Sequence, residues 1–287
     1  MTDLAPFYTD VQAHYDLSDD FFGLFLDKTR TYSCAYFEHE GMTLEQAQVA
    51  KVDLALAKCD LRPGMTLLDV GCGWGGTMMR AIEKYDVNVI GLTLSRNQHD
   101  YVQGLFDKLP GNRSAEVRLQ GWEEYDGGPV DRIVSIGAFE HFRRERYDAF
   151  FNLCHDLLPA DGRMLLHTIV GYHRHQLRDM GLKVDRNYLS FCKFLIDEIF
   201  PGGQLPEPPW VRTGAEAVGF RVERIHPLQL HYAQTLEIWT QNLIDRHDDA
   251  VEIASQEVFD RYIKYLSGCA TMFRDGYFDI MQFTLVK

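Results

Sequence analysis

Short apolar runs alternate with amphipathic segments through the middle of the chain, and this alternation predicts its architecture. Runs of strand length stand at 66–70, 87–93, 115–120, 130–136 and 163–170. Helix-compatible segments follow the first, second and fourth of these runs. Such alternation predicts an α/β fold, with a parallel sheet covered by helices on both faces. Ligands bind sheets of this kind at the carboxyl ends of the strands.

The segments on either side of this core have a different pattern. Before it, apolar residues recur with helical spacing over 7–27, and a capping box at Thr43 opens a helix that runs to about Cys59. After it, 188–200 has the broad apolar surface of a buried helix, and a proline-rich loop follows at 201–209. The pattern in the rest of the chain predicts a strand at 220–228, helices at 232–247 and 251–274, and a final edge strand at 278–286.

These patterns predict a single domain over 1–287 that has four parts. A long insertion in a compact α/β unit is usually functional, so the aromatic segment after the fifth strand is expected to cover the ligand edge of the sheet. The parts are an N-terminal helical cap segment at 1–62, the ligand-binding core at 63–170, a lid insertion at 171–210 and the completion of the sheet at 211–287.

The first strand runs into a glycine-rich turn. Asp69 is followed by Gly71 and Gly73, and another glycine comes at Gly75. Glycines let the backbone turn tightly and bring its N–H groups close to a ligand. The third glycine comes too early for a dinucleotide fingerprint, whereas Asp-x-Gly-x-Gly after a strand resembles the first motif of S-adenosylmethionine-dependent methyltransferases. The alternative is an ordinary glycine turn in some other α/β protein.

The ends of the second and third strands supply further candidates for cofactor binding. No acid follows the second strand to hold the ribose hydroxyls, so Thr93 and Gln98 are expected to bind the ribose, beside Leu94. Trp122 and Glu123 follow the third strand, where an aromatic ring commonly flanks adenine. Simple core packing is the alternative role of Trp122.

Side chains suited to acid–base and electrostatic chemistry follow the later strands. Glu140 and His141 come just after the fourth strand, His167 ends the fifth, and Tyr232 follows the sixth. Taken singly, a histidine is usually structural, and Glu140 could be a helix-start acid. Their joint placement at consecutive strand ends predicts that they converge on one pocket.

Composition and charge exclude several classes of function. The net charge of −13 disfavours nucleic-acid binding, and the one tight basic cluster, formed by Arg143, Arg144 and Arg146, is expected on a solvated helix face. The six cysteines have no metal-ligand spacing, so they are expected to be reduced thiols and no metal is predicted. The first residues lack a signal-peptide pattern and no uncharged run could span a bilayer. A cytoplasmic protein without a transmembrane segment is therefore expected.

Seven stretches spread along the chain carry a resemblance to one family. They are Ala13 to Asp16, Tyr32 to Phe37, Leu68 to Gly75, Gly91 to Ser95, Ser135 to Phe142, Glu198 to Gly203 and Tyr265 to Cys269. Through them the chain closely resembles, from end to end, the mycolic acid cyclopropane synthases, which are S-adenosylmethionine-dependent methyltransferases that act on long acyl chains. The resemblance implies a class I methyltransferase fold, with a Rossmann-like, mostly parallel seven-stranded sheet and a helical cap over the active site.

The resemblance also implies a role for individual residues. Those expected to bind the cofactor are Tyr32, Ser33, Asp69, Gly71, Gly73, Thr93, Leu94, Gln98, Trp122, Glu123 and Ile136. Those expected to surround a bicarbonate ion that serves as a base are Cys34, Ile136, Glu140, His167 and Tyr232. Cys269 is a further catalytic candidate, ranked lower because a buried helix thiol is inert unless its pKa is lowered.

The implied reaction adds a methylene carbon to a double bond of a long unsaturated acyl chain, held on an acyl carrier protein, and closes a cyclopropane through a carbocation. Relatives that add methyl and water tend to carry an acid at the position of Gly137, and some simple methyltransferases lack His141. This chain keeps both residues, which favours the cyclopropane. The alternatives are a methyl-branched, methylene or hydroxylated acyl product, a small-molecule N-methyltransferase, and a non-catalytic lipid- or S-adenosylmethionine-binding protein.

Overall fold

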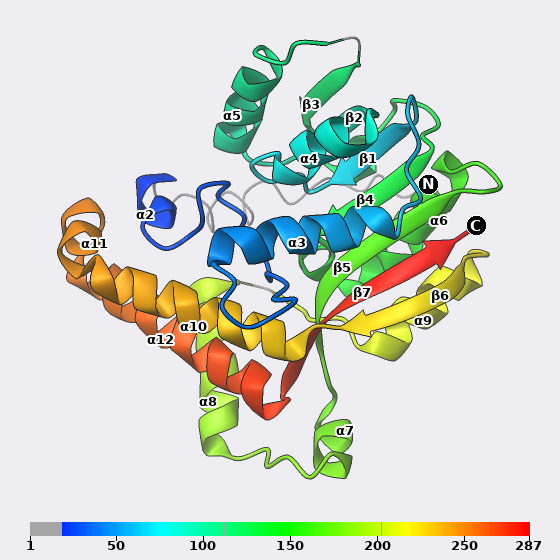
Figure 1. Ribbon diagram of the computed structural model, residues 1–287. Helices are drawn as coiled ribbons and strands as arrows, with labels where there is room; N and C mark the ends of the chain where they lie inside the picture. Colours follow the sequence, from blue (N-terminus) through cyan, green and yellow to red (C-terminus); the bar gives the residue numbers. More distant parts are fainter. Residues whose placement is uncertain (1–18, 112, 202) are drawn as a thin grey trace.

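In the computed structural model, a seven-stranded sheet forms the centre of the protein (Figure 1). The structure describes residues 19–111, 113–201 and 203–287. The strand order is β3-β2-β1-β4-β5-β7-β6. The strands are β1 (Thr66–Val70), β2 (Asn88–Thr93), β3 (Ala115–Leu119), β4 (Arg132–Ile136), β5 (Arg163–Gly171), β6 (Arg221–Pro227) and β7 (Phe278–Val286). Only β7 runs antiparallel to its neighbours among these pairings, which confirms the predicted mostly parallel α/β sheet.

The order of the strands places a crevice at the carboxyl end of β1. The chain first builds outward from β1 through β2 to β3, and then returns to place β4 on the other side of β1. The helices that leave β1 and β4 therefore diverge, and such a switch point is the usual ligand site of an open α/β sheet. In the register, Asp69 of β1 lies beside Gly91 of β2 and Val134 of β4. The ends of these three strands border one crevice.

Helices cover both faces of the sheet. One face is covered by α3 (Leu44–Ala57), α4 (Gly76–Tyr85) and α5 (Arg96–Phe106), and the other by α6 (Tyr147–Leu157) and α9 (Pro208–Ala217). Alternate residues of β1 separate the two cores, because Leu67 packs with α3 while Leu68 packs with α6. Both leucines are almost completely buried, as expected for strands of a doubly covered sheet.

The capping box predicted at Thr43 opens α3 as expected. The Thr43 hydroxyl accepts from the Gln46 backbone N–H at 3.3 Å, and the Gln46 side-chain oxygen accepts from the Thr43 N–H at 2.9 Å. These bonds satisfy backbone donors that the first turn leaves without intrahelical partners. The helix ends at Ala57, close to the predicted end near Cys59.

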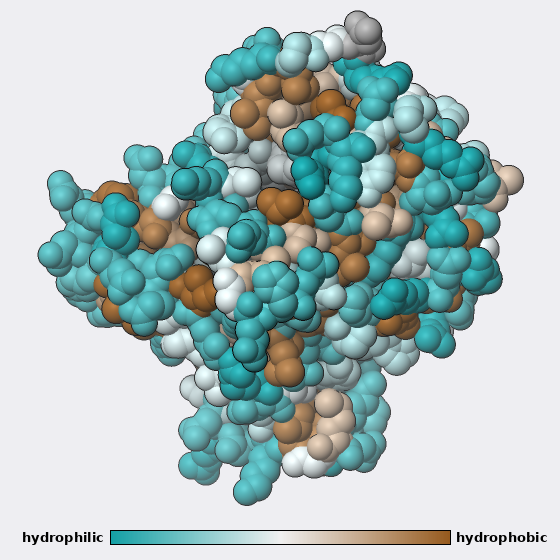
Figure 2. Space-filling view, viewed as in Figure 1, coloured by the Kyte–Doolittle hydropathy of each residue, from teal (hydrophilic) through white to brown (hydrophobic). Residues whose placement is uncertain are grey.

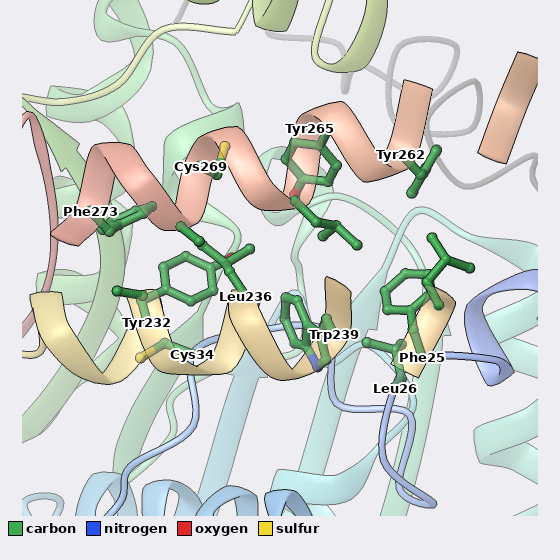
Figure 3. Close-up of a cluster of buried hydrophobic side chains, with 14 of the residues drawn as sticks. Phe25, Leu26, Cys34, Tyr232, Leu236, Trp239, Tyr262, Tyr265, Cys269 and Phe273 are labelled. Carbon is green, nitrogen blue, oxygen red and sulfur yellow. The ribbon is translucent and has the colours of Figure 1, made fainter. Parts of the chain in front are cut away.

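A third core lies between helices at one end of the sheet. The helices α10 (Gln229–Asp245) and α12 (Gln256–Asp275) lie side by side there (Figure 1), and side chains from both fill the space between them (Figure 3). This core also takes residues from α2 (Asp19–Gly23) and α8 (Arg186–Phe194). It brings the N-terminal region and the segment after β5 into contact with the end of the chain.

The final strand is not at the edge of the sheet, and that prediction was wrong. β7 lies between β5 and β6, so β6 is the edge strand. The burial pattern agrees with this, since nearly all of β7 is buried whereas β6 is largely exposed. The near-continuous apolar sequence of β7 is typical of an interior strand.

The helices after β5 also differ from the prediction. A short helix that was not expected, α7 (Arg174–Asp179), precedes α8. The helix expected over 188–200 begins at Arg186 and finishes as a π-helical segment, Leu195–Ile199. Helix α9 begins at Pro208, inside the expected loop, because proline fits the first turn of a helix. The helix expected over 251–274 is divided into α11 (His247–Ile253) and α12, with Ser255 capping α12.

The basic cluster is not a solvated helix face. Arg146 is buried, and its guanidinium donates to the Glu123 carboxylate at 2.7 Å. The Arg144 guanidinium lies 3.7 Å from the centre of the Trp210 ring. A short 3-10 turn, Arg144–Arg146, places Arg146 against the protein, while Arg144 stays exposed beside Trp210.

The surface agrees with a fold whose apolar residues are mostly inside. Figure 2 shows a face that is mainly hydrophilic and carries separate apolar areas. Among the described residues, no helix combines the length and apolarity needed to cross a membrane. The amphipathic pattern predicted over 7–27 is described only from residue 19 onward, as α2 and the turns after it.

Candidate active site

A cavity with both polar and apolar lining residues opens at the carboxyl ends of β1, β2 and β4, where the topology predicts a ligand. Every residue expected to bind the cofactor lines it, and these residues are Tyr32, Ser33, Asp69, Gly71, Gly73, Thr93, Leu94, Gln98, Trp122, Glu123 and Ile136. They come from the loop before α3, from the strand ends and from the turns that follow. The structure therefore brings together this whole predicted set.

Two glycines make the wall of this cavity from bare backbone. Gly71 has φ +81°, and an added Cβ would lie 2.5 Å from the Ala138 Cβ. Gly73 has φ +53°, and an added Cβ would meet no described atom within 4 Å, so it would extend into open space. Both conformations favour glycine, and at Gly73 they leave the backbone accessible to a ligand.

Two buried ionisable residues, Asp69 and Lys51, line the cavity. Asp69 and Lys51 are 2% and 1% exposed. Burial raises the pKa of Asp69 to about 7, against the opposing effect of Lys51, and burial lowers the pKa of Lys51 to about 8. One Asp69 oxygen, Oδ2, has no hydrogen-bond partner among the described residues. A buried carboxylate oxygen without a partner can accept a hydrogen bond from a bound ligand.

The far end of the cavity contains the residues expected around ribose and adenine. The Thr93 hydroxyl donates to the Gln98 side-chain oxygen at 2.7 Å and accepts from the Ser95 N–H at 3.1 Å. Trp122 lines the cavity and also packs edge-on against Phe150, with ring centres 5.3 Å apart. Core packing and ligand contact are therefore compatible roles for Trp122.

A second cavity adjoins the first and is mostly apolar. Four residues line both cavities, and they are Tyr32, Ser33, Gly137 and His141. The second cavity extends between α10 and α12, where Leu236, Cys269 and Phe273 lie (Figure 3), and toward the π-helical end of α8. The hydroxyl of Tyr32 is within 3.0 Å of the Tyr265 hydroxyl, which fixes one side of the junction.

Glu140 is a buried acid at this junction. It belongs to a 3-10 turn, Phe139–His141, directly after β4, and its carboxyl group lines the second cavity. The Thr168 hydroxyl donates to Glu140 Oε2 at 2.9 Å. Burial raises the pKa of Glu140 to about 7, while hydrogen bonds from the backbone and Thr168 oppose that shift. A carboxyl group with such a pKa is suited to acid–base or electrostatic work near neutral pH.

His167 lies behind the cavities and is fully buried. Gln282 Nε2 lies 3.1 Å from His167 Nδ1, and His167 Nε2 has no partner among the described residues. Burial lowers the pKa of His167 well below its usual value, and the positive charges of Lys51 and Lys58 act in the same direction. The ring is therefore neutral, with one nitrogen available to a ligand.

The remaining catalytic candidates differ in their access to the second cavity. Tyr232 and Cys269 line it, whereas Cys34 is fully buried and lines neither cavity. Burial raises the pKa of all three groups, and the negative charge of ionised Glu140 further raises the pKa of Tyr232. Glu140 and Tyr232 thus share one electrostatic environment. Neither thiol is activated, because no cation overcomes the effect of burial.

Comparison with known proteins identifies the family. The family model for mycolic acid cyclopropane synthetase matches residues 3–283. The chain belongs to this family. Cyclopropane mycolic acid synthase 1 from Mycobacterium tuberculosis (strain H37Rv) is 60% identical over 285 residues, which cover 99% of both chains. S-adenosylmethionine-dependent methyltransferase UmaA from the same organism is 56% identical over 287 residues, all of both chains.

Solved structures agree with this assignment to the cyclopropane synthetase family. The cyclopropane synthase MmaA2 from Mycobacterium tuberculosis has a TM-score of 0.97 and 57% identity, over the full length of both chains. Mycolic acid cyclopropane synthase CmaA1, complexed with SAH and CTAB, has a TM-score of 0.96 and 60% identity over 99% of each chain. Coclaurine N-methyltransferase, at 20% identity and a TM-score of 0.75, shares the fold alone. The chain is thus a homologue of S-adenosylmethionine-dependent methyltransferases, with their fold.

Some residues of the first cavity were missed by sequence reasoning. Lys51 lines this cavity and donates to the Ser33 hydroxyl at 2.9 Å, while Gln48 Nε2 donates to the Ser33 carbonyl at 2.8 Å. The signal was present, because both polar residues fall on the apolar stripe of α3, in step with Leu44 and Ala55. A polar residue on a buried helix stripe needs a partner, and here the partner is the wall between the cavities.

Proposed function

We propose that this protein transfers a methylene carbon from S-adenosylmethionine to a double bond of a long unsaturated acyl chain of the mycolic acid type, forming a cyclopropane. The observation that supports this best is the junction of the two cavities at Tyr32, Ser33, Gly137 and His141. A reaction between a polar methyl donor and an apolar chain needs both to reach one point. The acyl chain would be presented by an acyl carrier protein, in the cytoplasm. The free state of all six cysteines is in keeping with a reducing compartment.

The first cavity has the groups that S-adenosylmethionine needs. When bound, the cofactor supplies an electrophilic methyl group. The backbone at Gly71 and Gly73 would approach its amino-acid portion, and Asp69 Oδ2 would accept a hydrogen bond from it. Thr93 and Gln98 would bind the ribose hydroxyls, and Trp122 would flank the adenine.

We place a bicarbonate ion beside His167. The Nε2 atom of His167 is a buried polar atom without a partner among the described residues, and we propose the hydroxyl of Tyr232, which lines the apolar cavity, as a second donor to the ion. Cys34 and Ile136 complete the proposed surroundings. Bound bicarbonate would supply the base that accepts a proton from the newly added methyl group as the ring closes. The residues of the chain would hold it there by hydrogen bonds to its oxygens.

The apolar cavity would hold the acyl chain and exclude water. An isolated alkene is a weak nucleophile, and its attack on the methyl group leaves a carbocation on the chain. Water at that carbon would give an alcohol, so the aliphatic and aromatic lining is part of the proposed chemistry. The ionised Glu140 carboxylate and the face of the Tyr32 ring would stabilise the positive charge.

The residues at the junction favour a cyclopropane over the related products. Gly137 has φ +71°, and an added Cβ would lie 3.7 Å from the Ser33 Cβ, between the two cavities. An acidic side chain at this position would place a group that could order water where the cation forms. Methyl-branched, methylene and hydroxylated acyl products are the alternatives. They stay open because one relative, UmaA, is named as a methyltransferase rather than as a cyclopropane synthase.

The decisive experiment analyses the product made from an unsaturated acyl-carrier-protein substrate and S-adenosylmethionine. A cyclopropane adds one CH2 unit and gives ring-proton signals in NMR, whereas a hydroxylated product also contains the elements of water. Vinylic methylene protons would indicate a methylene product and contradict the proposal. The absence of any methyl transfer, with S-adenosylhomocysteine bound, would support a non-catalytic binding protein instead.

Replacement of Glu140 tests its electrostatic role. Glu140→Gln keeps the shape and removes the charge, so turnover should fall roughly a hundredfold or more, with binding of S-adenosylhomocysteine nearly unchanged. Glu145→Gln is the matched control, because Glu145 is an exposed acid in the next 3-10 turn. Melting temperature and turnover would be measured on the same samples. A less stable but fully active Glu140→Gln protein would show that Glu140 is only a helix-start acid.

Replacement of His167 tests the bicarbonate site. His167→Ala should slow product formation and leave the affinity for S-adenosylmethionine nearly intact, because the ring lies outside the cofactor cavity. Added bicarbonate should partly restore the rate by mass action. Unchanged turnover at limiting bicarbonate would remove His167 from the proposed mechanism.

A further inference from the structure

Three neighbouring strands place a row of polar side chains behind the cavities. Gln282 of β7 is in register with His167 of β5 on one side and with His226 of β6 on the other. Lys58, the residue that caps the end of α3, reaches this row from the helix. Its ammonium group lies 2.5 Å from Gln282 Oε1 and 3.1 Å from His226 Nδ1. The row thus links a half-buried lysine to the fully buried His167.

The chemistry of Lys58 fixes the direction of every hydrogen bond in the row. A protonated lysine can only donate, so the atom of Gln282 beside it is the carbonyl oxygen. The Gln282 amide nitrogen therefore faces His167, and it donates to Nδ1 at 3.1 Å. A neutral imidazole that accepts at Nδ1 carries its proton on Nε2.

We infer that Gln282, oriented by Lys58, is a positioning residue that holds His167 in the tautomer with the proton on Nε2. The inference rests on the proposed function, in which this nitrogen faces bicarbonate. The tautomer presents an N–H donor to an anion before the anion arrives. With the proton on Nδ1 instead, Nε2 would turn a lone pair toward the same negative charge.

Neighbouring positive charges disfavour a second proton on the His167 ring, which would turn both nitrogens into donors. Burial lowers the pKa of His167, and the positive charges of Lys51 and Lys58 lower it further. Gln282 is fully buried, so water does not compete for its amide. His226 accepts a hydrogen bond from Lys58 and burial lowers its pKa to about 4, so it also remains a neutral acceptor at neutral pH. The row therefore has one consistent set of donors.

Nitrogen-15 NMR of the histidine-labelled full chain measures the tautomer directly. The His167 signals are identified by their loss in a His167→Gln variant. The native ring should show a protonated Nε2 and a bare Nδ1. In Gln282→Glu the new carboxylate should attract the proton to Nδ1, because a carboxylate can only accept. A native ring protonated at Nδ1, or a ring unaffected by Gln282→Glu, would overturn the inference.

Kinetics then test what the tautomer does. Gln282→Glu and Lys58→Met should each raise the KM for bicarbonate, by roughly tenfold to a hundredfold if this partner matters as much as those that orient metal-binding histidines. The affinity for S-adenosylmethionine should not change. Lys84→Met is the control, an exposed lysine at the end of α4 that pairs with Asp53 and lies outside the row. Gln282→Met, which removes the hydrogen bond without adding charge, is the second variant should Gln282→Glu fold poorly.

The two measurements separate this inference from the proposed function. A changed tautomer with an unchanged KM for bicarbonate would confirm the positioning by Gln282 and contradict the role proposed for His167. A raised KM with an unchanged tautomer would contradict the positioning and leave the role of His167 intact.

Discussion

The two cavities that meet at Tyr32 and Ser33 are built in different ways. The cavity proposed for the cofactor is lined mainly by strand ends and the turns after them, including the glycine turn at Gly71 and Gly73. The apolar cavity is lined by side chains of helices that lie far apart in the sequence, including α8, α10 and α12. Short local motifs therefore determine the first cavity, whereas the second depends on how separate helices pack. The two should respond to mutation in correspondingly different ways.

The largest effect is expected from a single glycine of the cofactor cavity. Gly73→Val would place a branched side chain in the open space beside the backbone, at φ +53°. S-adenosylhomocysteine should raise the melting temperature of the native protein. At a free concentration of one hundred times its Kd, it should increase the free energy of unfolding by about 2.7 kcal/mol. The shift should vanish in Gly73→Val, as measured by thermal unfolding with and without the ligand.

Gly128→Val is the control for backbone strain. Gly128 also has a left-handed φ, of +81°, with open space around it, but it lies outside both cavities. This variant should lose stability and keep the full shift. No shift in the native protein at saturating ligand would contradict cofactor binding altogether.

The next effect concerns the ionisation of Glu140 at the junction. Because burial raises its pKa to about 7, the ionised fraction falls about tenfold for each pH unit below that value. Turnover should therefore rise with pH up to about 7 and level off above it, at a fixed concentration of bicarbonate. The turnover of the Glu140→Gln protein should not show this rise with pH. The same pH profile in both proteins would mean that another group causes the rise.

Stability should change with pH in the opposite sense. A folded-state pKa above the unfolded value means that the folded state binds the proton more tightly, so Glu140 favours folding most below its unfolded pKa. That contribution is lost as the pH rises through about 7. Glu140→Gln should consequently be more stable relative to native protein at pH 8 than at pH 4, by thermal unfolding. The reverse order would contradict the burial argument.

A smaller effect is expected where the helices build the apolar cavity. An acyl ligand should slow hydrogen exchange in α8 and its π-helical end, because Leu195 and Ile196 line the cavity while Ile196 is still 48% exposed. The amides of α5 are the internal control, since that helix covers the other end of the sheet. Protection elsewhere with unchanged exchange in α8 would move the acyl site away from this segment.

The smallest effect is expected from Cys269. Burial raises the pKa of its thiol, so it is not a nucleophile at neutral pH, and its role is to line the apolar cavity. Cys269→Ala should change turnover only a few-fold and shift the melting temperature modestly. A loss as large as that of Glu140→Gln would make the thiol part of the chemistry.

The sequence predicts the features that depend on local motifs better than those that depend on contacts between distant segments. The parallel core was predicted correctly, and the residues expected to bind the cofactor line one cavity, because period and glycine placement are local signals and parallel strands end at one edge. The interior place of β7 was not predicted, because its apolar sequence indicates burial but does not say which strands will be its neighbours. Lys51 was missed because its partner, Ser33, lies in another segment. The divided helix at Ala254 was missed because apolar periodicity continues across it.

The interior position of β7 has a consequence for how the protein is made. β5 ends at Gly171, and β7 begins at Phe278, about a hundred residues later. At the usual rate of synthesis, roughly 5–20 residues per second, one side of β5 waits roughly 5–20 seconds for its partner on the ribosome. During that time its backbone groups form an open edge of the kind to which other chains add strands. The nascent chain therefore carries an open sheet edge until its last strand is made, and a chaperone that covers β5 would act in that interval.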